Sequence, residues 1–345
     1  MVTVESYAIA VVMCVITMLC WGSWANTQKL ASKEWKFQLF YWDYCIGVLL
    51  LTVIFALTLG SMGSQGRSFF DDLGQASLQA LGLALLGGIV FNLANILLVA
   101  AIDIAGMAVA FPIGIGIALV EGVIVNYIRD PKPDPKYLFV GVAGIVVAIL
   151  IDAAAYRRLP ADKEKTLGKG IALSVVCGLL MGFFFYLVAA AMAPIASIDD
   201  VAFAGKLTPY TALVLFGVGL FLSSFVFNTI VMAKPFVGSP VPFGDYFKKG
   251  NPRLHLVGIV GGMIWGVGMS FAIIAGDTAG FAISYGLGQG ATMVAALWGV
   301  FIWREFKVAP KGTNALLALM FLFFIIGLTL IVIANPEVAG KLKAA

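Results

Sequence analysis

Long apolar stretches separated by short polar connections run through nearly the whole chain. Most are apolar on all sides for about 20 residues, the length at which an α-helix crosses the hydrocarbon core of a bilayer. Strands of a membrane barrel would instead alternate apolar and polar residues over segments of about 10 residues. The pattern predicts ten spanning helices near 7–28, 38–60, 77–101, 105–128, 137–156, 169–193, 209–233, 255–276, 279–303 and 313–334.

Composition places the chain in a membrane. Hydrophobic residues make up 61% of the 345 residues and charged residues 12%, whereas a soluble domain carries about 45–50% and about 25%. The net charge of +4 includes no basic cluster on a polar domain, so no nucleic-acid partner is expected. No HExxH, GxSxG or phosphate-loop motif and no Cys/His cluster occurs, so the sequence predicts neither an enzyme nor a cofactor or metal site.

An internal repeat divides the chain into two halves. A shift of 174 positions aligns Gly87-Gly88 with Gly261-Gly262, Asp103 with Asp277, Gly106 with Gly280, and Gly114 and Gly116 with Gly288 and Gly290. Five spans per half is an odd number, so the second half must enter the membrane inverted. We therefore predict an all-α membrane protein of two inverted five-helix repeats, residues 1–156 and 169–345, joined by a linker at 157–168.

Charge predicts the orientation of these spans. Of the 22 Lys and Arg residues, 15 lie in or beside the connections that follow the first, third, fifth, seventh and ninth spans. Cytoplasmic loops carry the excess of Lys and Arg in membrane proteins. Both termini are therefore predicted outside, in the cell inner (plasma) membrane.

Glycine and proline predict helix breaks at matching places in the two halves. These residues are Pro112, Gly114 and Gly116 in the fourth span, and Gly286, Gly288 and Gly290 in the ninth. Paired interruptions of this kind mark the solute site of many secondary transporters. Close helix packing through small residues is the alternative explanation, and both can hold together.

Amides inside the spans are candidates for binding a neutral solute. Asn92 and Asn95 share one helical face with Gly88, and Tyr285, Gln289 and Thr292 repeat this geometry in the ninth span. Amides offer both donors and acceptors, which suits a polyhydroxy or urea-like molecule. The alternative is hydrogen bonding between helices.

Two tryptophans and one acid complete the candidates. Trp21 and Trp24 lie on one face of the first span, where they either mark the membrane interface or stack on a sugar or heterocycle ring. Glu121 is a carboxylate inside the fourth span. Such an acid is costly in a bilayer and points to a function, here the binding and release of a coupling proton. Glu121 could instead simply extend its side chain to the nearby interface.

The residues also resemble a known superfamily. Cys20-Trp21-Gly22-Ser23-Trp24, Tyr41-Trp42-Asp43-Tyr44 and the run 280–290 resemble the drug/metabolite transporters, in the branch of glucose/ribose porters, rhamnose transporters and ureide permeases. The resemblance implies a cavity between two five-helix halves, alternating access and proton-coupled uptake. It implies cavity contributions from Trp21, Trp24, Asn92, Asn95, Tyr186, Trp265, Tyr285 and Gln289. The short loop at 157–168 departs from the long hydrophilic insertion of plant ureide permeases, which favours a bacterial sugar-type or uncharacterised member and argues against allantoin as the substrate.

The sequence therefore predicts a secondary active transporter that imports a small neutral polar solute, with a sugar favoured. A ureide or nucleobase permease is the first alternative, and an exporter of amphipathic drugs or metabolites is the second. The exporter would have a cavity lined by aromatic and methionine side chains with few amides. A receptor without transport is the least favoured. The expected partners are the solute, protons and the lipid bilayer, and homodimerisation is left open.

Overall fold

A computed structural model describes residues 1–159, 167–198 and 200–344. It is almost entirely helical, and ten helical segments are long and apolar enough to cross a membrane, as the sequence predicted. In chain order these are α1 Tyr7–Ser23 with its continuation α2 Ala25–Ala31, α3 Phe37–Leu57, α5 Leu78–Ala105, α6 Met107–Arg129, α7 Pro135–Tyr156, α8 Leu167–Ala191, α9 Pro209–Ala233, α11 Pro252–Ala279, α12 Phe281–Gly288 with α13 Ala291–Leu297, and α14 Thr313–Ile333.

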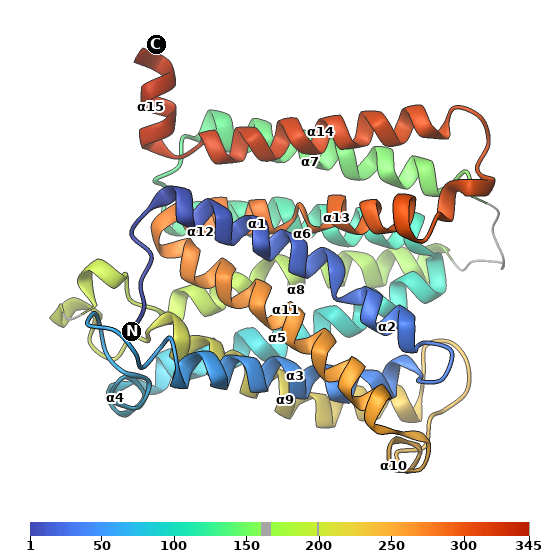
Figure 1. Ribbon diagram of the computed structural model, residues 1–345, viewed down its shortest axis with the longest axis horizontal. Coiled ribbons are helices and arrows are strands. Elements are labelled where there is room, and N and C mark those ends of the chain that lie inside the picture. Colours follow the sequence, from blue (N-terminus) through green and yellow to red (C-terminus); the bar gives the residue numbers. More distant parts are fainter. Residues whose placement is uncertain (160–166, 199, 345) are drawn as a thin grey trace.

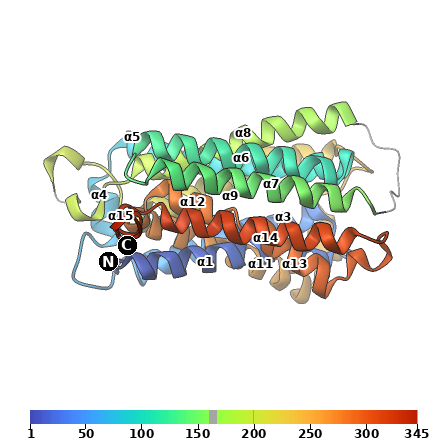
Figure 2. The ribbon, with the colours of Figure 1, turned by 90° about the horizontal axis from the view of Figure 1, so that it is seen from above.

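The spans run back and forth along one long axis, and both termini lie at the same end of the bundle (Figures 1 and 2). We call this the N/C end; it also carries the connections 58–77 and 192–208. The far end carries the connections 32–36, 234–251 and 303–312. Shorter elements in these connections and after the last span are α4 Phe69–Gln75, η1 Ile195–Ser197, η2 Val201–Phe203, α10 Asp245–Lys249, η4 Glu305–Val308 and α15 Pro336–Ala344.

Single glycines make the two sharpest reversals between spans. Gly106 separates α5 from α6 with φ 80°, and Gly280 separates α11 from α12 with φ 89°. Residues with a Cβ atom rarely adopt such positive φ angles, so glycine permits a turn of one residue here. The same two positions are aligned by the shift of 174 residues.

Helix packing also agrees with the repeat. α5 packs against α8 and α9, while α11 packs against α1 and α3. At these contacts a Cβ on Gly88 would lie 2.0 Å from the carbonyl oxygen of Phe216, and one on Gly262 would lie 2.0 Å from that of Tyr44. Glycine therefore lets both helix pairs approach closely. The inverted relation and the boundaries 1–156, 157–168 and 169–345 stay predictions, and residues 160–166 of the linker lie outside the described residues.

The predicted breaks occur in only one of the two spans. α6 runs from Met107 to Arg129 without interruption, so the break expected at Pro112, Gly114 and Gly116 is wrong. A proline removes only one backbone hydrogen bond, and packed neighbours often preserve a membrane helix around it. The ninth span is interrupted at residues 289–290, between α12 and α13. Gly290 lies in this interruption, whereas Gly286 and Gly288 lie within α12.

Candidate functional site

A cavity of about 620 Å³ extends from the middle of the bundle toward the far end. Its walls come from α1, α2, α3, α5, α6, α7, α8, α11, α13 and the segment after α13. The described residues that line it include five expected from the sequence, namely Trp21, Trp24, Asn95, Trp265 and Gln289. The N/C-end connections contribute none of the described lining residues. The described lining residues therefore place the cavity between the middle of the bundle and its far end.

Stacked aromatic rings close the inner end of the cavity. The ring of Trp265 lies 4.3 Å from that of Phe91 and 5.8 Å from that of Trp21, with interplanar angles of 29° and 13°. Phe216 stacks on Trp265 at 5.8 Å. Phe91 and Trp265 are themselves 174 positions apart, so the repeat pairs the two rings that meet. We call Trp21, Phe91 and Trp265 the aromatic floor.

Amide groups stand in the cavity walls above this floor. The Nδ2 of Asn95 donates to the hydroxyl of Tyr41 at 3.3 Å, and its Oδ1 has no hydrogen-bond partner among the described residues. Gln289 lies in the interruption between α12 and α13, so its backbone leaves the helix where its side chain borders the cavity. Within the described part of the chain, the side chains of Gln28 and Gln289 form no hydrogen bond. These three amides can therefore bind a solute.

A charged cluster lies at the far end of the cavity. Glu305 accepts from Lys29 at 2.6 Å and from the hydroxyl of Tyr156 at 2.9 Å, so it connects η4 to both α2 and α7. Lys29 also lies over the ring of Trp303, 4.3 Å from its centroid. Asp152 lines the cavity one turn before Tyr156. We call Lys29, Asp152, Tyr156 and Glu305 the mouth cluster.

Three expected site residues lie outside the cavity lining. Asn92 is buried and donates to Ser223 at 2.7 Å while accepting from Tyr41 at 2.9 Å, which joins α5 to α9 and α3. The hydroxyl of Tyr285 donates to the carbonyls of Ala118 and Met181, which joins α12 to α6 and α8. Tyr186 packs beside Phe183. Hydrogen bonding between helices, the alternative considered above, therefore describes Asn92 and Tyr285.

Glu121 also lies outside the cavity lining. It packs against Gly182 of α8, and its Oε2 is buried without a hydrogen-bond partner in the described structure. Its coupling role stays a prediction. The sequence reasoning missed the mouth cluster, although Asp152 is likewise an acid inside a predicted span. Its spacing of four residues from Tyr156, on one helical face, was the available signal.

An ion pair and hydrogen bonds join two connections at the N/C end. Arg67 lies 2.9 Å from Asp72 and donates to the carbonyls of Ile198 and Lys206, while Asp72 accepts from the backbone of Thr208 at 2.8 Å. These contacts join the 58–77 connection of the first half to the 192–208 connection of the second. We call them the N/C-end latch. Burial and repulsion from Arg129 lower the pKa of Lys206 beside it.

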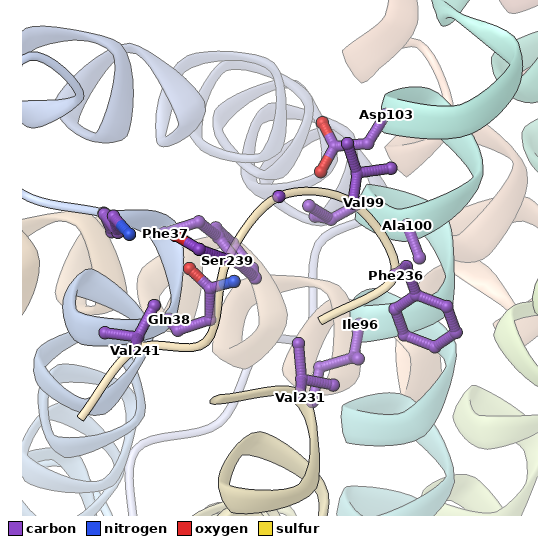
Figure 3. A pocket seen from close by; sticks show the side chains of 13 residues that line it. Phe37, Gln38, Ile96, Val99, Ala100, Asp103, Val231, Phe236, Ser239 and Val241 are labelled. Atoms are coloured by element: carbon purple, nitrogen blue, oxygen red, sulfur yellow. The ribbon is translucent and has the colours of Figure 1, made fainter. Parts of the chain in front are cut away.

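A second cavity of about 260 Å³ adjoins the first (Figure 3). Phe37, Val99 and Asp103 line both cavities and therefore separate them. The loop after α9 forms one side of the smaller cavity, and Figure 3 shows Phe236 of that loop beside Ile96 and Ala100 of α5. This loop thus borders the far-end approach to the main cavity.

Ten spans around a cavity that lies between the middle of the bundle and one of its ends define a multi-pass membrane transport protein. A model of the ureide permease family matches residues 40–171 and 163–334. The chain belongs to the ureide permease family, a family of transporters rather than enzymes.

Individual relatives agree with this assignment. The chain is 26% identical to Ureide permease 1 of Arabidopsis thaliana, over 97% of this chain and 99% of that protein. It is 25% identical to the Probable glucose uptake protein GlcU of Priestia megaterium, over 68% of this chain and 70% of that protein. A solved crystal structure aligns with a TM-score of 0.55 and 15% identity, over 98% of this chain and all of that one. This last similarity concerns the fold alone.

Proposed function

We propose that this protein is a secondary transporter that imports a small, neutral, polar solute of the ureide class by proton-coupled alternating access. The observation that carries the proposal is a cavity with an aromatic floor and amide walls in a member of the ureide permease family. A ureide is a compact molecule of conjugated N–H and C=O groups. Asn95, Gln28 and Gln289 can pair with both kinds of group.

The size and charge of the cavity suit such a solute. Its volume of about 620 Å³ falls within the range of about 300–1,000 Å³ usual for small-molecule pockets. The ring of Trp265 can support a flat conjugated group. Lys29 is paired with Glu305, so this cation is already neutralised and does not call for an anionic solute.

The sequence alone favoured a sugar as the solute. Membership of the ureide permease family favours a ureide instead. The short loop at 157–168 had favoured a sugar, yet the family match extends on both sides of that loop. Loop length therefore does not discriminate between these solutes. The likeness to the Probable glucose uptake protein GlcU makes a sugar the second candidate.

The cavity lining argues against the exporter of amphipathic compounds. That alternative called for aromatic and methionine side chains with few amides. Ten of the described lining residues are aromatic, as that alternative required, but Met181 is the one methionine among them and four, Asn26, Gln28, Asn95 and Gln289, carry amides. A solute with hydrogen-bonding groups fits this lining better than a hydrophobic cation does.

We place the far end in the cytoplasm, and the charge distribution supports this orientation. The connections rich in Lys and Arg lie at that end. The structure then corresponds to an inward-facing state, with the N/C-end latch closing the outside. Import requires the latch to open and the mouth cluster to close in the opposite state.

A binding screen tests the solute class. The purified protein in detergent is heated with ureides, nucleobases, sugars or hydrophobic cations, and its melting temperature is recorded. A ligand of the folded state at a hundredfold excess over its Kd stabilises it by about 2.7 kcal/mol. We expect a shift with a ureide such as allantoin. A shift with glucose alone would support the second candidate, and shifts with hydrophobic cations alone would support an exporter.

A further inference from the structure

The buried carboxylate oxygen of Asp152, Oδ1, has no hydrogen-bond partner among the described residues. The residue is 9% exposed and lines the main cavity from α7. Its Oδ1 is inaccessible and accepts no hydrogen bond from any residue that the structure describes. A buried carboxylate is ordinarily paired or hydrogen bonded, because an isolated charge is costly away from water. An unpartnered acid at this place therefore calls for a function.

The surroundings of Asp152 increase the cost of its charge. Glu305 lines the same cavity and accepts a hydrogen bond from Tyr156, one helical turn after Asp152, so a second carboxyl group belongs to the same cluster, and like charges repel. The cation of the cluster, Lys29, is bound to Glu305 at 2.6 Å, and Tyr156 donates to Glu305 as well. Both partners bind Glu305 and neither binds Asp152, so Asp152 is the carboxyl group of the cluster that lacks a hydrogen-bond partner among the described residues.

Few other ionisable groups face Asp152. Among the described residues that line the cavity, Asp103 is the one ionisable residue that does not belong to the mouth cluster. The helix α14, which packs against α7, has none in its sequence. The helix α6, which also packs against α7, carries Glu121, Tyr127 and Arg129, all outside the cavity lining.

We propose that Asp152 is the residue that binds the coupling proton. This inference rests on the proposed function. The proton comes from water at one side of the membrane, binds a carboxylate oxygen of Asp152 and leaves to water at the other side. No covalent bond of the solute forms or breaks.

The geometry explains how the proton couples to movement. Closing the far end would remove water from the mouth cluster and bring Asp152 and Glu305 together in a less polar environment. Two carboxylates that are both charged oppose this closure, because their desolvation and mutual repulsion are costly. A protonated Asp152 permits it. Glu121 lacks this link, since it lies between α6 and α8 away from the cavity.

Transport by reconstituted protein tests the assignment. Proteoliposomes receive labelled allantoin with a pH difference of one unit, acidic outside, and exchange of internal for external solute is measured in parallel without a pH difference. One proton per solute supports accumulation up to about tenfold under these conditions. In the Asp152→Asn variant we expect the internal solute to reach the outside concentration and no more, while exchange continues. Asp152→Glu keeps a carboxyl group and should restore accumulation. Glu34→Gln alters an exposed carboxylate at the same end and serves as the control.

Each outcome decides between defined alternatives. Accumulation by D152N overturns the proton assignment and leaves the proposed function intact, and a loss of accumulation in Glu121→Gln alone would place the proton there. Loss of both accumulation and exchange in D152N, restored together by D152E, would instead make Asp152 a ligand of the solute. If the wild type does not carry allantoin, the proposed substrate class fails. The infrared band of a protonated carboxyl group, expected in the wild type and missing in D152N, then still tests Asp152 without any solute.

Discussion

The pair of Arg67 and Asp72 tests how the N/C end stays closed. Asp72 is fully buried, while the side chain of Arg67 is 19% exposed. Arg67→Ala leaves the buried carboxylate without its cation and removes the hydrogen bonds to the 192–208 connection. Breaking a buried ion pair costs about 3–5 kcal/mol, and we take about 3 because Arg67 is partly exposed. This corresponds to a shift on the order of a hundredfold toward the state in which the N/C end is open.

Distances between the two joined connections provide the assay. Spin labels at the exposed positions Ser64 and Val201 report their separation in liposomes, after replacement of Cys20, the one cysteine that is not buried. We expect longer distances in Arg67→Ala. Arg67→Ala combined with Asp72→Asn removes the charge together with its partner, so its shift should be smaller. Distances and melting temperature both equal to the wild type in Arg67→Ala would refute the role of the latch.

Two further substitutions test the cavity wall and the helix packing. Asn95→Leu removes an acceptor from the cavity, so the half-saturating concentration of allantoin in uptake should rise about tenfold, the equivalent of about one hydrogen bond; an unchanged value would exclude Asn95 from binding. Gly262→Ala would place a Cβ 2.0 Å from the carbonyl of Tyr44 and should destabilise the fold by about 1–3 kcal/mol, visible as a lower melting temperature. Gly74→Ala, with no atom within 4 Å of the added Cβ, is its control, and equal melting temperatures would contradict the packing account.

Hydropathy predicted the spans because each must satisfy its backbone hydrogen bonds within itself in lipid. The expected range 209–233 coincides with α9, and the expected boundary near residue 105 falls beside Gly106, where a positive φ ends α5. The break expected at Pro112 failed for a different reason. Whether a proline interrupts a helix depends on packed neighbours that the local sequence does not reveal.

The sequence predicts which side chains share a face of one helix, but not which other helix that face contacts. Asn92 and Asn95 share a face of α5, yet Asn92 reaches Ser223 and Asn95 borders the cavity. The difference arises from the position of α9, which the pattern along α5 does not contain. The contact of Lys29 with Glu305 joins residues 276 positions apart. Such contacts depend on how the two halves pack together. The mouth cluster could therefore be recognised as a cluster only in the folded structure.

Competition for uptake tests whether the cavity selects a ureide. Wild-type proteoliposomes receive labelled allantoin at a fixed inward pH gradient, together with an excess of unlabelled allantoin, uracil or glucose. A cavity that selects a ureide should give concentrative uptake of allantoin that unlabelled allantoin abolishes and glucose leaves unchanged. Uptake of labelled glucose without any uptake of allantoin would contradict it.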